Sequence, residues 1–154
     1  MAFLKKLLVL AIIAAVILSM AAYDYFRAQD TKIEVVSISP ERVEANPNQP
    51  VLITLRVTTQ GELAVGDTVA ALLKGQGSLS GDKAKVGEDG TVTFKYYPYT
   101  VIPGVFDESD VEIEFRNISD SVFVAIQKRE SVVFHVYEAE EESGGMNMGD
   151  LFGE

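Results

Sequence analysis

The chain contains a single histidine, and no pattern around it predicts catalysis. His135 lies in the alternating stretch SVVFHVY, on the face opposite Phe134 and Val136. An imidazole without a clustered partner is typical of a half-exposed strand residue rather than of a general base or a metal ligand. Serines are plentiful, but no G-x-S-x-G motif and no second histidine complete a triad. The sequence therefore predicts a protein that is not an enzyme and uses no cofactor.

Two acidic clusters are the next candidates for chemistry, because carboxylates bind calcium. The clusters are Asp107, Glu108 and Asp110, and Asp82, Glu88 and Asp89. Neither has the D-x-D-x-D-G spacing that wraps a calcium ion, so we expect solvated turns and no metal site. The absence of cysteine from the sequence also excludes a disulfide framework and a thiolate metal site.

The negative charge of the chain lies after the N-terminal segment. The formal net charge of the chain is −10, while residues 1–30 carry +1, so the remaining residues carry −11. A surface of this sign repels phosphate backbones, and no basic patch is present in the sequence. The composition excludes nucleic acid as a partner, and no motif indicates a small-molecule substrate.

An unbroken apolar run, LLVLAIIAAVILSMAA, occupies residues 7–22 and follows directly after Lys5 and Lys6. Continued as a helix through the next residues, YDYF, the run reaches roughly 25–30 Å, which is sufficient for a bilayer core. The two lysines place the N-terminus in the cytoplasm, and the aromatic residues of YDYF match an outer interfacial belt. We expect residues 7–23 to lie in the cytoplasmic membrane, with the chain from about Asp24 onward exported to the periplasm or cell surface.

The same run also matches a signal peptide. It has a basic start, an apolar middle and Ser19-Met20-Ala21 as a small-x-small cleavage site. Cleavage after Ala21 would release a secreted binding module. Both interpretations export the rest of the chain, and we take the retained anchor as the leading one.

Behind a helical neck, the sequence changes to the alternation that is typical of strands. The clearest example is VLITLRVTT, which places Ile53, Leu55 and Val57 on one face. The expected strands cover residues 33–38, 51–59, 68–74, 91–97, 111–115, 122–126 and 132–136, with short strands near Leu79 and Val86. Short strands at this spacing, without an amphipathic helix after the neck, predict an all-β, two-sheet antiparallel sandwich.

Several details of the sandwich follow from the same pattern. A slip in the alternation between Val35 and Ile38 predicts a β-bulge. The stretch ERVEANPNQP is expected to be a loop, and the pair Asp89-Gly90 fits a hairpin turn. The side chains that should be buried between the two sheets include Leu55, Phe94, Ile113 and Phe134.

Part of the predicted sandwich resembles bacterial Ig-like domains of the invasin/intimin type. In that family a G-x-P-x-x-G-x-x-V stretch begins a strand, a Gly/Ser-rich segment follows, and a D-G turn leads into an alternating strand. The matching residues here are Gly61, Gly66, Val69, Gly90, Val92 and Phe94. Ala64 stands where a proline is usual, and the final strands match poorly. The resemblance implies an Ig-like fold, but such domains serve as adhesins, spacers and assembly subunits alike.

The 154 residues therefore divide into three parts: an anchor and neck at 1–31, the sandwich at 32–137, and an acidic tail at 138–154. The tail carries a net charge of −6 and several glycines, which is typical of a flexible end.

Two surface features are candidates for partner contacts. The stretch KYYPY leaves Tyr97 and Tyr99 facing away from the core, either as contact residues or as a cap on the sandwich. The tail is either a solubilising end or a docking segment built on the apolar residues Met146, Met148, Leu151 and Phe152.

These features predict a single-pass membrane protein that acts as a non-catalytic accessory or structural subunit of a membrane or cell-envelope assembly. Its partners would be the membrane and other membrane or envelope proteins. The main alternative is a surface filament, pilus-type or adhesin subunit, in which an extended segment completes a neighbour's sheet. The layout is also similar to that of anchored sandwich subunits of the archaeal flagellum-like motor, although no motif is shared. A hydrolase or a sugar-binding enzyme accessory is the remaining class.

Overall fold

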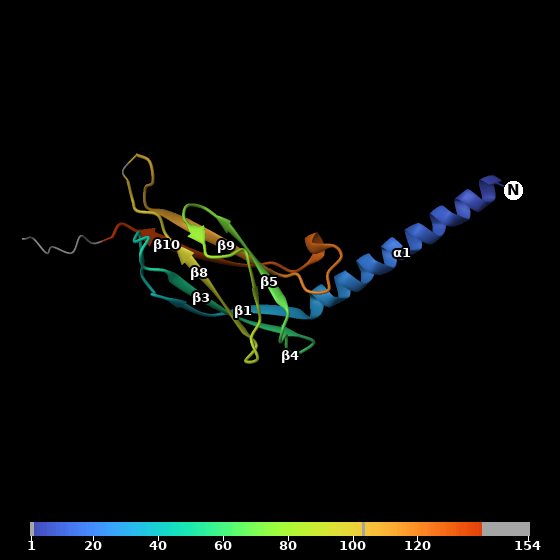
Figure 1. The fold of residues 1–154 in the computed structure, drawn as a ribbon, viewed down its shortest axis with the longest axis horizontal. Coiled ribbons are helices and arrows are strands. Elements are labelled where there is room, and N and C mark those ends of the chain that lie inside the picture. Colours follow the sequence, from blue (N-terminus) through green and yellow to red (C-terminus); the bar gives the residue numbers. More distant parts are fainter. Residues whose placement is uncertain (1, 103, 140–154) are drawn as a thin grey trace, which may run out of the picture.

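The fold is one long helix followed directly by a β-sandwich. The computed structural model describes residues 2–102 and 104–139. Helix α1 (Ala2–Asp30) passes without a break into strand β1 (Thr31–Ser39) and projects away from the sandwich (Figure 1). From Phe3 onward, α1 is long and apolar enough to cross a membrane, a property that a signal sequence shares. We call the end of the sandwich that carries α1 the proximal end, and the opposite end the distal end.

Two sheets form the sandwich. Sheet A has the order β1, β3 (Val51–Thr59), β8 (Thr91–Tyr97) and β6 (Ser78–Leu79), with β4 (Glu62–Leu63) also paired to β3. Sheet B has the order β2 (Val43–Glu44), β10 (Glu130–Tyr137), β9 (Ser109–Asn117), β5 (Thr68–Lys74) and β7 (Lys83–Lys85). Neighbouring strands are antiparallel except β2 and β10. The orders β1-β3-β8-β6 and β10-β9-β5 match the two sheets of a constant-type Ig domain, so the predicted fold class is confirmed.

Alternate side chains of the long strands fill the space between the sheets. Leu55, Phe94 and Ile113 are buried, as predicted, and the ring of Phe94 lies 5.3 Å from that of Phe115 across the core. Phe134 packs against this core but is only half-buried. The reason is that β2 pairs only with Val136 and Tyr137, the last residues of β10, so the edge of β10 beside Phe134 stays open.

Tyr96 is fully buried although it carries a hydroxyl group. The hydroxyl donates a hydrogen bond to the carbonyl oxygen of Gln76 at 2.7 Å, which satisfies the polar tip of the side chain. Burial raises the pKa of the Tyr96 phenol to about 12. The ring also lies against Gly77, where a Cβ atom would overlap it. Glycine at this position is therefore required by the close approach of the tyrosine.

The predicted bulge is present, but one predicted strand is absent. The pairing of β1 with β3 shifts register between Val35 and Ser37, as the broken alternation indicated. Residues 122–126 were expected to form a strand, and that prediction is wrong: they contain the 3₁₀-helix η1 (Val124–Ile126). Strand β9 is already paired on both edges, by β5 and β10, so a further strand has no place beside it.

The connections between the sheets also differ from the expectation. Asp89-Gly90 forms a tight turn, but β7 pairs with β5 rather than with β8, so the turn joins the two sheets and does not close a hairpin. Strand β7 ends before Val86, whose side chain is buried in the core. The expected loop at residues 41–50 contains the short strand β2, which runs parallel to the end of β10.

Candidate functional site

The junction of α1 with the sandwich is the most elaborate polar site in the described part of the chain. No linker separates the two parts, since α1 ends at Asp30 and β1 begins at Thr31. The backbone N–H of Gln60 donates to the carbonyl oxygen of Asp30 at 3.0 Å. The hydroxyl of Thr31 donates to the carbonyl oxygen of Arg27 at 3.0 Å, and Thr31 is itself buried. The last turn of the helix is thus bonded to the start of the sheet.

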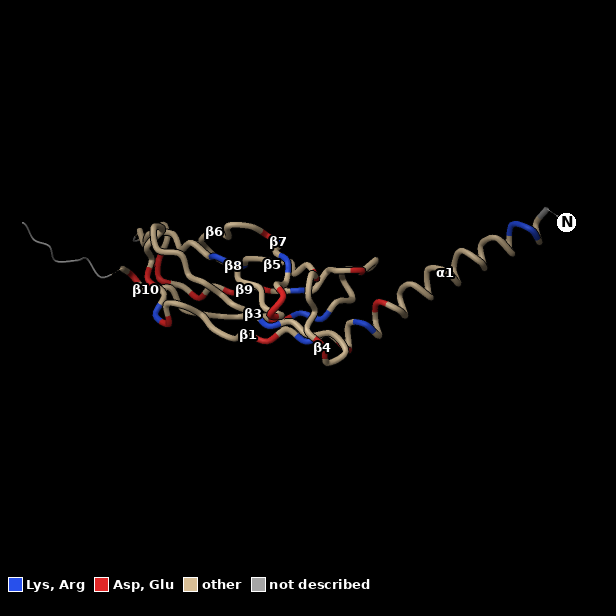
Figure 2. The backbone as a smooth tube through the Cα atoms, turned by 60° about the horizontal axis from the view of Figure 1, so that its bottom comes forward, with Lys and Arg blue, Asp and Glu red and all other residues tan. Residues whose placement is uncertain are grey.

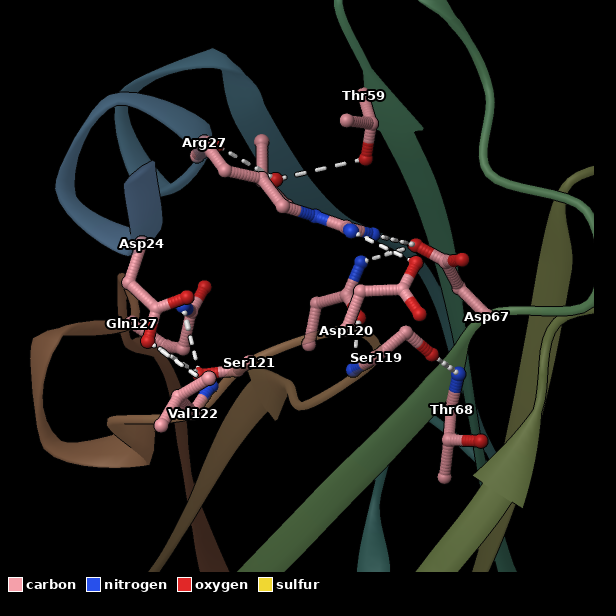
Figure 3. A network of polar contacts seen from close by, with 12 residues as sticks. Asp24, Arg27, Thr59, Asp67, Thr68, Ser119, Asp120, Ser121, Val122 and Gln127 are labelled. Atoms are coloured by element: carbon pink, nitrogen blue, oxygen red, sulfur yellow. Dashed lines mark hydrogen bonds and ion pairs between the residues drawn. The ribbon is translucent and has the colours of Figure 1, made fainter. Parts of the chain in front are cut away.

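Asp24 is the deepest polar residue of this junction. It is 0% exposed, and its Oδ2 atom accepts hydrogen bonds from the backbone N–H groups of Val122 at 2.9 Å and Phe123 at 2.5 Å (Figure 3). The Ser121 hydroxyl lies 3.4 Å from the same oxygen. The Oδ1 atom is buried without a hydrogen-bond partner among the described residues. A buried carboxylate is stabilised by such donors, so the loop after β9 replaces the water that Asp24 would otherwise need.

Arg27, one helical turn after Asp24, joins α1 to two further segments. Its guanidinium lies 3.2 Å from the Oδ2 atom of Asp67, which precedes β5, and 2.8 Å from the Oδ2 atom of Asp120 (Figure 3). The Asn117 side-chain amide donates to the same oxygen of Asp67 at 2.6 Å. A planar guanidinium with several donors suits this bridging role better than a lysine would. We call Asp24, Arg27, Asp67, Asn117 and Asp120 the junction network.

The loop that carries these donors is held by its own hydrogen bonds. The Ser119 hydroxyl accepts a hydrogen bond from the backbone N–H of Thr68 at 2.6 Å, which ties the loop to β5. Gln127 is buried, and its amide donates to the Ser121 hydroxyl at 3.0 Å. The donor presented to Ser121 and the donors presented to Asp24 therefore belong to one ordered segment between β9 and β10.

A groove of about 540 Å³ opens beside the junction network, between α1 and the connection from β3 to β5. Tyr23 and Phe26 line it from the helix, and Leu63 and Val65 line it from the sandwich. All four side chains are exposed. Exposed apolar side chains gathered in one place are typical of a surface that another molecule covers.

The distal end brings together residues that the sequence placed apart. His135 is a half-exposed residue of β10, as predicted, but the fold gives it two acidic partners that the sequence did not indicate: its Nδ1 atom lies 2.8 Å from Asp110 and its Nε2 atom 3.8 Å from Glu108. Glu108 also accepts a hydrogen bond from the backbone N–H of Glu138 at 2.7 Å. The acidic loop is therefore partly paired with β10 rather than simply solvated. Within the described ranges, no group of three or more His, Cys, Asp or Glu residues is arranged to hold a metal ion.

The two tyrosines predicted as partner contacts do not lie at the junction. Tyr97 is half-buried, and Tyr99 is exposed with its ring 5.4 Å from that of Phe106 in the loop between β8 and β9. Their role as contacts stays a prediction. The apolar cluster of the tail, Met146, Met148, Leu151 and Phe152, lies outside the described residues.

Sequence reasoning treated the neck only as a helical extension and missed the junction network. One local signal was present: Asp24 and Arg27 are three residues apart, which places them on one side of a helix, directly after the apolar run. A carboxylate so close to a hydrophobic span requires partners. The partners themselves, Asp67 and Asp120, carry no recognisable spacing relative to the helix.

Three solved structures are similar to this chain at low sequence identity. The D00-D0 domain of intimin is 14% identical, with a TM-score of 0.48, and the match covers 67% of this chain and 48% of that one, so the chain spans about half the intimin fragment. A conjugative transposon lipoprotein from Bacteroides eggerthii is 14% identical, with a TM-score of 0.40 and coverage of 70% and 96%. A conjugate transposon protein from Bacteroides vulgatus is 13% identical, with a TM-score of 0.38 and coverage of 73% and 87%. No protein-family profile matches the sequence, and no curated protein matches it.

Proposed function

We propose that this chain is a single-pass, membrane-anchored and non-catalytic subunit of a cell-envelope assembly, with its N-terminus in the cytoplasm and its sandwich outside. Its role is structural: it holds the sandwich at a set height and orientation above the membrane. The observation that carries the proposal is the junction network, which joins α1 to the sandwich through buried polar contacts and without a linker. A domain that only needed to be tethered would not require such contacts, since a flexible linker suffices for tethering.

The same network supports a retained helix over a cleaved signal. Cleavage after Ala21 would leave Asp24 and Arg27 on about two and a half helical turns at 3.6 residues per turn. Helices of that length are marginal in isolation, so the polar contacts would have to hold a frayed end. Ala21 is also half-buried in the folded protein, unlike the exposed residues that precede it. An intact α1 explains both features.

Lateral contacts in the membrane follow from one face of α1. Ala11, Ala15 and Ala22 lie on the side of the helix that leads to Phe26, which lines the groove at the junction. Small residues let helices approach closely in lipid, and the groove continues that surface beyond the bilayer. A neighbouring membrane subunit could therefore pack along α1 and end in the groove.

The free edge of β1 bears on the filament alternative. Strand addition needs a regular open edge, but β1 is interrupted by the register shift between Val35 and Ser37. Lys32 and Glu34 are exposed along the same strand, and charged side chains discourage pairing with another chain. These features of β1 favour the accessory subunit over strand addition at this edge of the sandwich.

The proposal is tested by making the junction flexible. Inserting Gly-Gly-Gly between Asp30 and Thr31 should leave membrane insertion intact but allow the sandwich to swing. In mild detergent, the wild-type chain should co-migrate with partner subunits, and the insertion should abolish this co-migration.

The matched control is the same insertion after Gly81, in the exposed connection between β6 and β7, which should keep the partners. Two results would count against the proposal: a wild-type chain that migrates alone, or a junction insertion that retains its partners.

A further inference from the structure

We infer that the loop between β9 and β10, residues 118–129, rests in the outer interfacial layer of the same bilayer that α1 crosses. We call this segment the interface loop. Val122 and Val124 are its lipid-facing side chains, and the ligand is the bilayer surface itself rather than a second protein. The inference rests on the proposed function, because it requires a retained transmembrane helix.

Hydrogen bonds set the height of the interface loop relative to the membrane. The backbone N–H groups of Val122 and Phe123 both bond Asp24, so this part of the loop lies level with Asp24 on the helix. Asp24 follows the last residue of the apolar run, Ala22, by only about 3 Å at 1.5 Å per residue. In Figure 1 the interface loop, coloured orange, extends from the sandwich beside the final turns of α1. The loop is therefore the part of the sandwich nearest to the lipid.

Side chains at this height are those that favour an interface. Tyr23 and Tyr25 are exposed on α1 one residue before and one after Asp24, which is the position of an aromatic belt. On the loop, Val122 is 58% exposed and Val124 is 42% exposed. Valine side chains left in water at the end of a sandwich gain nothing, whereas the boundary between headgroups and acyl chains buries apolar side chains.

The backbone of the interface loop is suited to a region with little water. The N–H groups of Val122 and Phe123 are satisfied by Asp24, and those of Ile126 and Gln127 bond carbonyl oxygens within the loop at 2.9 and 3.2 Å. Unsatisfied backbone groups are costly near lipid, so a loop can approach the bilayer only when its donors are occupied. The 3₁₀ turn and the contact with Asp24 meet that requirement for these four N–H groups.

The charge of the interface loop is opposite to that of the rest of the sandwich. Lys128 and Arg129 outnumber Asp120, giving residues 118–129 a formal charge of +1, whereas residues 31–139 together carry −6. Lys128 and Arg129 are exposed, Arg129 also lies 3.5 Å from Glu114, and Asp120 is paired with Arg27. Lys128 and Arg129 lie at the end of the interface loop, and exposed cations near a membrane surface are attracted to anionic lipid headgroups.

The test uses site-specific fluorescence in the full chain, which is possible because the chain has no native cysteine. Val122→Cys and Val124→Cys report on the interface loop. Val133→Cys, on β10, is the matched control, since Val133 is 62% exposed but lies away from the loop. Ile13→Cys, in the middle of α1, reports on insertion of the helix. Each variant is labelled with an environment-sensitive dye and reconstituted in vesicles of phosphatidylcholine and phosphatidylglycerol that contain a nitroxide-labelled lipid.

Quenching by the lipid nitroxide should be about threefold stronger at Val122 than at Val133, because interfacial side chains lie about 5–10 Å into the headgroup boundary. Strong quenching at Ile13 with equal, weak quenching at Val122, Val124 and Val133 would overturn the inference while leaving the anchor intact. Absence of quenching at Ile13 would remove the anchor and the inference together. A blue-shifted but unquenched dye at Val122 would indicate a second copy of the chain over the loop and would also overturn it.

Discussion

The two ends of the sandwich use the same kinds of side chain in opposite ways. At the proximal end, Asp24 is fully buried and accepts two backbone hydrogen bonds. At the distal end, the side chain of Asp110 is 71% exposed although it lies 2.8 Å from His135. A carboxylate becomes part of the framework when the fold supplies its donors, and remains a surface group when water supplies them. Contact distance alone does not separate the two cases, whereas burial does.

This difference gives the molecule a polarity along its long axis. Figure 2 shows α1 leaving one end of the sandwich and acidic residues gathered near the other end, where β10 finishes. The proximal end is therefore built for a defined attachment, and the distal end presents charge to solution. In the proposed function, the first property sets the orientation of the subunit and the second faces the exported neighbours.

The hydrophobic core between the two sheets connects the proximal and distal ends. Truncating a core side chain should have the largest effect on the free energy of unfolding. Phe94→Ala should lower the free energy of unfolding by about 3–5 kcal/mol, and Leu55→Ala by about 2–5 kcal/mol, because both side chains are buried between the sheets. Lys95→Ala, on the exposed face of the same strand as Phe94, should change it by less than about 0.5 kcal/mol. Urea unfolding of the three variants measures this. Equal losses for Phe94 and Lys95 would contradict the assignment of faces.

The next largest effect should separate the ends directly. Asp24→Ala leaves the N–H groups of Val122 and Phe123 without their acceptor and should cost about 1–3 kcal/mol. Asp110→Ala, the matched distal change, should cost less than about 0.5 kcal/mol because an exposed ion pair contributes little. Thermal unfolding in detergent micelles compares the pair, and equal shifts of Tm would erase the distinction drawn between the two ends.

The sequence supports the sandwich far better than it supports the junction, for a physical reason. Alternation along a strand is a local property, so the buried faces of β3 and β8 and the bulge in β1 were all predictable. Residues 122–126 alternate just as well, yet they form η1, because β9 has no free edge and Asp24 takes the loop's donors. A contact between positions 24 and 122 spans most of the chain. No local pattern encodes it, which is why the partners of Asp24 and Arg27, and the acidic partners of His135, were missed.

The smallest expected effect concerns a third arrangement, the ion pairs on the outer face of sheet B, midway between the two ends. Arg116 and Lys74 both contact Glu114, and Lys74 also lies 3.1 Å from Glu112. Hydrogen bonds from Arg116 hold the pKa of Glu114 below its usual value, and the hydrogen bond from Lys74 does the same for the pKa of Glu112. Glu114 is buried and Glu112 is half-buried, and each is paired with a cation. This arrangement therefore stands between the fully buried Asp24 of the proximal end and the exposed Asp110 of the distal end.

Because the pKa values of Glu112 and Glu114 are lowered in the folded state, the stability that their ion pairs contribute decreases as the pH falls. The unfolded chain takes up protons first, near the ordinary pKa of 4.5, so the stabilisation is complete above that pH and is lost as the pH falls through the lower folded values. Lys74→Met removes the cation that both carboxylates share, so the decline in Tm from about pH 5 to about pH 3 should become shallower than in the wild type. Lys95→Met, which removes an exposed lysine from the outer face of sheet A, should keep the wild-type slope. If Tm falls with pH equally in the two lysine variants, the acid response does not arise from the ion pairs of Lys74. The carboxylates of sheet B would then contribute as little to stability as the exposed ones of the distal end.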